Sequence, residues 1–338
     1  MTRLLSKTIR SFLITARIEL AGFSFVAVIG AMTVCGKTIP LSDVVMLFVF
    51  NVLLVIFGFI HNDYEDLDID KRLPELSNRP LVNGSVSRRQ ARYWSISLFI
   101  LALLLAHLYF RDTRTSVLFF SALFLAAVYN KLSKRILGAD IFYGLSSGAL
   151  FLFGAAAVSG GHESFSIFTL LMTGVMVLEH LFFNIASGQL KDVRFDRAAG
   201  VKTLAVALSR VENGVTHIHP AFKALCLAIK LTTYSIIFSL FFFSIIPVYR
   251  WQIILLALFT CGSFFLSVTL LYTPIEQREK ILDCSRKQEV FSKSLTPMVL
   301  LPQIGIFWLL IFTVGPVIWF SFFNYLLNRE FLGNPKTF

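Results

Sequence analysis

Apolar residues along this chain fall into long blocks, and shorter polar stretches separate the blocks. A membrane-spanning helix needs about 20 mostly apolar residues. Nine blocks approach that length, at about residues 13–35, 43–61, 93–110, 115–130, 139–158, 165–188, 223–246, 252–273 and 297–326. The last block is long enough to be tilted or broken, and Pro302 and Pro316 lie inside it. The pattern predicts an all-α polytopic membrane protein with nine transmembrane helices in a single domain, 1–338.

Composition and charge support this prediction. The chain is 56% hydrophobic and 15% charged, whereas soluble domains have about 45–50% apolar and about 25% charged residues. The net charge is +11, and its distribution favours a membrane topology over nucleic-acid binding. With nine spans, the N-terminus and the loops 62–92, 131–138, 189–222 and 274–296 share one side. That side holds 24 of the 31 Lys and Arg residues when Lys223, at a loop edge, is included. Positive residues concentrate on the cytoplasmic side, so we expect the N-terminus and these loops there.

Acidic residues directly follow the second apolar block. If the helix continues beyond that block, Asn62, Asp66 and Asp70 lie at i, i+4 and i+8. Asp63 joins the same face, because it precedes Asp66 by three positions and Asp70 by seven. Like charges at this spacing destabilise an isolated helix, so a compensating cation is expected. Mg²⁺ is the natural candidate, since it takes oxygen ligands and binds one or two carboxylates together with substrate phosphates.

A second acidic pair, Asp192 and Asp196, follows the sixth apolar block at i, i+4. The predicted topology puts both acidic stretches on one side of the membrane. Two carboxylate clusters that face one cavity can hold two or three Mg²⁺ ions around a diphosphate. Each cluster alone is typical of a solvated surface, but the combination in a nine-span chain is not.

These motifs resemble the UbiA superfamily of intramembrane prenyltransferases. The resemblance rests on Asn62-Asp63-x-x-Asp66-x-x-x-Asp70, Asp192-x-x-x-Asp196-x-x-x-Gly200 and the stretch 129–135. Family members usually have a proline after the tyrosine of that stretch, where this chain has Asn130. The resemblance implies nine helices around a central cavity with cytoplasmic helical cap loops at about 62–92 and 189–222. It also implies a transferase that uses Mg²⁺ to move an isoprenoid from a polyprenyl diphosphate to an aromatic, quinone-precursor or lipid acceptor.

The resemblance also assigns roles to individual residues. The expected metal-binding residues are Asn62, Asp63, Asp66, Asp70, Asp192 and Asp196, of which the catalytic set is Asp66, Asp70, Asp192 and Asp196. The expected diphosphate-binding residues are Arg72, Lys131, Arg135 and Lys191, with Arg79 a less firm assignment. Candidate acceptor-site residues are Arg17, Tyr143, His180 and Asn184. The expected partners are an isoprenyl diphosphate donor, a hydrophobic or amphipathic acceptor and the lipid bilayer, with no nucleic acid.

Two other functions fit parts of the sequence. A terpene cyclase of the same fold would ionise the isoprenyl diphosphate without a second substrate. A transporter is a common function of polytopic chains, but its charged residues usually lie near the membrane midplane, whereas these carboxylates cluster in loops. The acceptor, the isoprenoid chain length and the oligomeric state stay open at this point.

Overall fold

The computed structural model describes residues 7–34, 38–160 and 163–329, and regular structure within these ranges is mainly helical. The first helices are α1 (Lys7–Thr15), α2 (Ile18–Ala21), α3 (Val26–Met32), α4 (Leu41–Asp70), α5 (Arg88–Phe110), α6 (Thr113–Leu132) and α7 (Asp140–Ser159). They are followed by α8 (Ile167–Phe182), α9 (Val193–Ala198), α10 (Leu204–Ala207), α11 (Pro220–Phe242), α12 (Arg250–Tyr272) and α13 (Arg278–Asn328). A short 3-10 turn (Pro74–Leu76), a π-helical turn (Phe183–Gly188) and the strands β1 (Ser209–Glu212) and β2 (Val215–Ile218) complete the fold.

The predicted all-α membrane class is confirmed. Among the described residues, eight helices are long and apolar enough to cross a membrane, and α1 with the segment 18–32 forms one further candidate, bent by 47°. Large apolar side chains cover the outside, and Leu108, Phe265 and Phe307 are each about two-thirds exposed. Soluble proteins rarely expose apolar surface on this scale, so the chain is an integral, multi-pass membrane protein.

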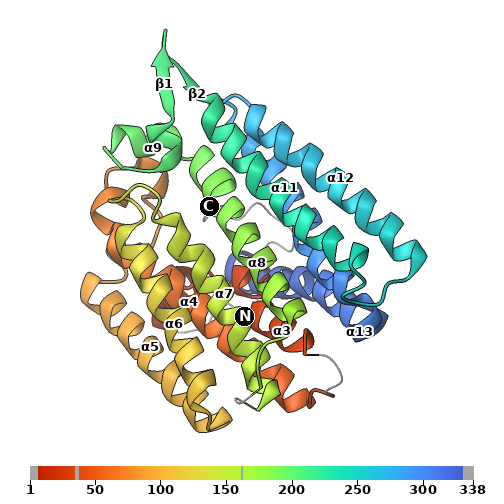
Figure 1. Ribbon diagram of the computed structural model, residues 1–338. Coiled ribbons are helices and arrows are strands. Elements are labelled where there is room, and N and C mark those ends of the chain that lie inside the picture. The colour runs from red at the N-terminus through yellow and green to blue at the C-terminus, as the bar shows by residue number, and fades with distance from the viewer. Residues whose placement is uncertain (1–6, 35–37, 161–162, 330–338) are drawn as a thin grey trace.

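The helices form one bundle in which α4 to α8 lie on one side and α11 to α13 on the other (Figure 1). The two sides meet where α8 packs against α11, while α3 packs against α7 inside the bundle. The α3–α7 contact depends on glycine. A Cβ atom on Gly30 would collide with the carbonyl oxygen of Phe151, and one on Gly154 would collide with that of Ala27. The missing side chains let the two backbones touch, as small residues do at membrane helix interfaces.

The last apolar block is broken, as its length suggests. Within α13, Gly305 has φ 72° and ψ 173°, outside the helical region, a conformation that glycine adopts at little cost. Pro302 precedes the break and removes a backbone donor from the helix. Helix α13 also begins at Arg278, well before the predicted start of the ninth block near residue 297.

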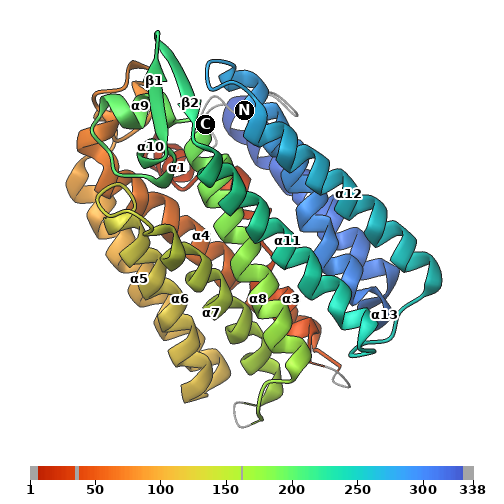
Figure 2. The ribbon, with the colours of Figure 1, turned by 45° about the horizontal axis from the view of Figure 1, so that its top comes forward.

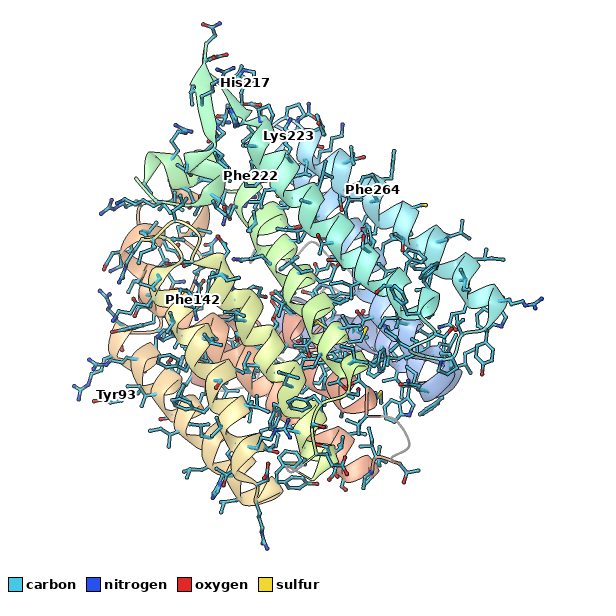
Figure 3. The ribbon with its side chains drawn as sticks, viewed as in Figure 1. Tyr93, Phe142, His217, Phe222, Lys223 and Phe264 are labelled. Atoms are coloured by element: carbon cyan, nitrogen blue, oxygen red, sulfur yellow. The ribbon has the colours of Figure 1, made fainter. Side chains whose placement is uncertain are left out.

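One end of the bundle carries the cap segments, and we call it the cap end. Helices α9 and α10 and the β1–β2 hairpin lie together there (Figure 2), and His217 marks the hairpin in the side-chain view (Figure 3). The predicted helical cap over 189–222 is correct for α9 and α10 but wrong for 209–218. Asn213 and Gly214 both have positive φ, 50° and 79°, which gives the two-residue Asn-Gly turn that favours a hairpin.

Candidate active site

Both acidic stretches line one cavity of about 580 Å³ at the cap end of the bundle. The wall includes Asn62, Asp66 and Asp70 from the end of α4, and Asp192 and Asp196 from the chain after α8. The deeper wall is largely apolar and includes Val26, Leu54, Val55, Phe59, Leu150 and Phe183. The cavity therefore joins a charged mouth to an apolar interior.

Helix α4 continues past its apolar part to Asp70, as the i, i+4 spacing requires. Asn62 donates a hydrogen bond to Asp66 (Nδ2 to Oδ2, 3.1 Å), and Asp66 and Asp70 are buried. Asp63 is also buried but is not among the residues that line the cavity. Its carboxylate contacts the guanidinium groups of Arg17 at 2.8 Å and Arg79 at 3.5 Å.

The second acidic pair depends on an irregular stretch of backbone. The π-helical turn Phe183–Gly188 follows α8 directly, and π-turns inside helices occur frequently at functional sites. Asn184, Ser187 and Gly188 of this turn line the cavity, as do Gln189 and Asp192 after it. Asp196 is one turn further along α9, and its backbone N–H donates to the carbonyl of Asp192 (2.8 Å).

The carboxylates at the charged end of the cavity are partly buried and close to one another, so cations are needed to stabilise their ionised forms. The pKa of Asp196 is raised to about 7, mainly by burial and further by the nearby carboxylates of Asp192, Asp66 and Asp70, while Lys134 acts in the opposite direction. Burial alone would lower the pKa of Lys134, but the surrounding carboxylates of Asp66, Asp70 and Asp196 outweigh it, so that this pKa is raised. The cluster therefore stabilises positive charge brought into it.

Three cationic side chains of the cavity wall contact the carboxylates that line it, and a fourth contacts Asp63. Lys134 Nζ lies 3.0 Å from Asp66 and 3.8 Å from Asp70, and Arg79 lies 2.7 Å from Asp70. Arg278, at the start of α13, lies 3.4 Å from Asp192. The fourth is Arg17, which reaches Asp63 behind the cavity wall.

Arg17 takes up an uncommon backbone conformation. It has φ 44° and ψ 49° between α1 and α2, a left-handed conformation that costs a non-glycine residue about 1–2 kcal/mol. Its guanidinium group lies 4.8 Å from the centre of the Phe59 ring while it donates to Asp63. The break in the first span therefore places the guanidinium group of Arg17 beside the acidic end of α4.

The residues predicted to bind diphosphate are only partly brought together. Lys191 lines the cavity, and burial lowers the pKa of its ammonium group, an effect that Asp192 opposes. Arg72, Lys131 and Arg135 are exposed and are not among the lining residues. Arg135 instead forms an ion pair with Glu65 at 3.1 Å. The set implied by the resemblance does not include Lys134 and Arg278, which do line the cavity.

The four candidate acceptor-site residues all line the cavity. Tyr143 and His180 lie side by side, with ring centres 5.8 Å apart. His180 Nδ1 lies 2.9 Å from the carbonyl oxygen of Met176, which can only accept, so Nδ1 carries the proton. Asn184 lies one turn further towards the cap end and hydrogen-bonds Tyr129 and Asp140.

The donor set fits Mg²⁺ bound together with a phosphate ligand. Among the described residues, no three His, Cys, Asp or Glu side chains converge as a complete metal site. Asn62, Asp66, Asp70, Asp192 and Asp196 instead offer hard oxygen atoms on two walls of one cavity. Mg²⁺ is usually bound by one or two carboxylates plus substrate phosphates and water, and not by a cage made of protein alone.

Comparison with known proteins gives a consistent result. The model of the UbiA prenyltransferase family matches residues 23–281. A digeranylgeranylglyceryl phosphate synthase from Thermococcus kodakarensis is 28% identical over 190 residues, covering 55% of this chain and 64% of that protein. A 4-hydroxybenzoate octaprenyltransferase from Nitrosospira multiformis is 33% identical over 201 residues, covering 58% of this chain and 66% of that protein. The alignments thus span slightly less than two-thirds of these curated relatives.

A solved structure shares the fold. It is a UbiA homologue from Archaeoglobus fulgidus bound to DMAPP and Mg²⁺, and it has a TM-score of 0.61 and 17% sequence identity to this chain. The superposition covers 85% of this chain and 99% of the homologue. The likeness extends over the bundle that forms the cavity.

Proposed function

Since the chain belongs to the UbiA prenyltransferase family, we propose that it transfers an isoprenoid from an isoprenyl diphosphate to a hydrophobic or amphipathic acceptor, with release of diphosphate. The observation that carries this proposal is the meeting of two acidic stretches in one cavity with an apolar interior. The names of the relatives are consistent with it, because one is a digeranylgeranylglyceryl phosphate synthase and the other a 4-hydroxybenzoate octaprenyltransferase.

Magnesium is the cofactor in this proposal, as in the homologue described with DMAPP and Mg²⁺. Asn62, Asp66, Asp70, Asp192 and Asp196 would hold it. Bound Mg²⁺ neutralises the negative charge that develops on a departing diphosphate. We leave Asp63 in a supporting role, because its carboxylate is engaged by Arg17 and Arg79.

The chain's own cations share the work of holding the diphosphate. We assign this role to Lys134, Arg79, Lys191 and Arg278, which line the cavity. Arginine can bind phosphate through two parallel hydrogen bonds, while lysine acts as a point charge. Lys134 contacts Asp66 and Arg79 contacts Asp70, so these cations lie where charge changes on substrate binding.

The apolar interior has a separate task. Cleavage of the allylic C–O bond leaves a cation that water would consume, so the reacting end must be kept dry. Leu54, Val55 and Leu150 line this part of the cavity and would also receive the isoprenoid tail. We further propose that the cap end faces the cytoplasm, because the Lys-rich and Arg-rich loops predicted on that side include both acidic stretches.

An assay of the purified protein tests the proposal. In detergent or nanodiscs, with Mg²⁺ and geranyl or geranylgeranyl diphosphate, we expect diphosphate release that depends on an added acceptor and on Mg²⁺. Mass spectrometry should find the acceptor enlarged by one isoprenoid unit. Release without acceptor, together with a terpene hydrocarbon or alcohol, would identify a cyclase instead, and substrate flux into vesicles without diphosphate cleavage would identify a transporter.

Replacement of Lys134 tests the assignment from the cavity geometry against the assignment of Lys131 from the family resemblance. We expect Lys134→Met to lower kcat/KM for the donor by about 10- to 100-fold, since a hydrogen bond to a charged group is worth about 1.5–3 kcal/mol. Lys131→Met is the matched change on the exposed side of the same helix end. Steady-state kinetics with varied donor concentration measure both variants, and an equal loss in the two would contradict the assignment to Lys134.

A further inference from the structure

Asp140 is a buried carboxylate of the cavity wall that the donor site does not use. It is the first residue of α7 and 5% exposed, and it lines the cavity with Tyr129 and Asn184. No charged partner of Asp140 is found among the described ion pairs. A buried carboxylate is costly unless hydrogen bonds satisfy it, so its partners define what it can do.

Two side-chain amides hold one oxygen of this carboxylate. Asn184 Nδ2 donates to Asp140 Oδ1 at 2.6 Å, and Gln189 Nε2 donates to the same atom at 2.7 Å. The π-helical turn Phe183–Gly188 lies between the two donors along the chain and lets both reach one atom. Among the described residues, Oδ2 receives no side-chain donor.

The donors of the hydrogen bonds around Asp140 follow from the chemistry of their partners. The backbone N–H of Ala205 can only donate, and it donates to Gln189 Oε1 at 3.0 Å, which forces the amide NH₂ of Gln189 towards Asp140. The ionised carboxylate of Asp140 can only accept, so Asn184 presents its NH₂ group to it, and Asn184 Oδ1 accepts from the Tyr129 hydroxyl at 2.8 Å. Both amides therefore present N–H donors to Asp140 Oδ1.

From this geometry we infer that Asp140 binds the hydroxyl group of the acceptor and takes its proton during transfer. The inference rests on the proposed function and names the acceptor class: a molecule with an alcoholic or phenolic hydroxyl. Asn184 and Gln189 act as positioning residues, because they hold Oδ1, whereas no side chain among the described residues donates to Oδ2. Asp140 belongs to the same cavity wall as the acidic mouth but to a different element from either acidic motif.

The step balances as follows for an alcohol. The O–H bond breaks and its proton moves to Asp140 Oδ2, while the acceptor oxygen forms a bond to C1 of the isoprenoid. The C1–O bond breaks, and its electron pair leaves with the diphosphate. In a phenol the same proton transfer raises the electron density of the ring, so that the ortho carbon forms the bond to C1, and the ring proton then passes to the oxygen.

Asp140→Asn tests the role, because asparagine keeps the shape and an oxygen for the two amides but cannot take the proton. Geranylgeranyl diphosphate labelled with ¹⁸O at the bridging position reports ionisation through movement of the label to non-bridging positions. Two probes, geranylgeranylglyceryl phosphate and 4-hydroxybenzoate, supply the alcohol and the phenol. We expect transfer to the accepted probe to fall by about 100-fold or more, as for loss of a general base, with label exchange within about threefold of wild type.

Tyr129→Phe provides a second variant that removes only the hydroxyl orienting Asn184. We expect a smaller loss of transfer, about tenfold, again with label exchange retained. Transfer at the wild-type rate in Asp140→Asn would overturn the inference, and so would parallel loss of exchange and transfer, which identifies a purely structural role. Label exchange by the wild type with prenylation of neither probe would contradict a hydroxyl acceptor. Wild-type protein that neither exchanges label nor releases diphosphate would instead contradict the proposed function.

Discussion

Asp66→Asn and Asp192→Asn are each expected to reduce isoprenoid transfer by about 10³-fold, because metal-assisted stabilisation of the leaving diphosphate is worth several kcal/mol. The two residues belong to different sequence motifs but line one cavity. Neither change adds bulk, so the bundle should keep its fold. Diphosphate release at saturating donor, followed over a range of Mg²⁺ concentrations, measures the effect.

Asp68→Asn is the matched control for this pair. Asp68 belongs to the same acidic stretch, but its side chain is 66% exposed and pairs with Arg88 at 3.1 Å. It is not among the residues that line the cavity. We expect turnover close to wild type in this variant, with equal thermal midpoints for all three. Turnover near the wild-type level in Asp66→Asn or Asp192→Asn would remove the basis of the proposed function.

Periodicity was sufficient to predict the membrane class and the helical extension of α4. Apolar blocks about 20 residues long have few alternatives to membrane helices. The spacing of Asn62, Asp66 and Asp70 likewise has physical content only on a helix, and α4 does continue to Asp70. The residue spacing thus predicted which side chains share one face of α4, but it did not predict which residues lie opposite them across the cavity.

The periodicity of the stretch 129–135 separates residues that line the cavity from residues that do not. Asn130 and Lys134 are four residues apart and both line the cavity, and so are Tyr129 and Ser133. Lys131 and Arg135 are also four apart and share the other phase, which is exposed. The tyrosine stretch therefore contained enough information to select Lys134, had the wall-facing phase been fixed first.

Other features have no local signature. Arg278 contacts Asp192 across 86 positions of sequence, and only the packing of α13 against the cap end brings the two together. The π-helical turn at Phe183–Gly188 lies inside the apolar block predicted over 165–188, and the spacing of proline and glycine there does not predict its position. The β1–β2 hairpin was predictable from Asn213 and Gly214, but its short strands were hidden inside a loop assigned to helical caps.

A buried ion pair links three helices on the other side of the bundle. Lys230 of α11 is fully buried, and its Nζ lies 2.8 and 2.6 Å from the two carboxylate oxygens of Glu179 on α8. Ser292 of α13 accepts from Lys230 at 2.5 Å and donates to Glu179. Neither Glu179 nor Lys230 is among the cavity-lining residues. Ionisable residues inside membranes are functional candidates in general, but these contacts favour a structural role.

Lys230→Met is accordingly expected to destabilise the fold by about 3–5 kcal/mol, because it leaves the carboxylate of Glu179, which is only 16% exposed, without its charged partner. The double variant Glu179→Gln with Lys230→Met should regain most of this loss, since replacing both charges removes the desolvation cost of the pair as well as its attraction. Unfolding of the purified protein by SDS titration in mixed micelles measures all three free energies. A single variant as stable as wild type, or a double variant no more stable than the single one, would show that the pair does not hold α8, α11 and α13 together. A loss of isoprenoid transfer in a double variant of normal stability would show that the charges serve the reaction after all, at a distance from the cavity wall.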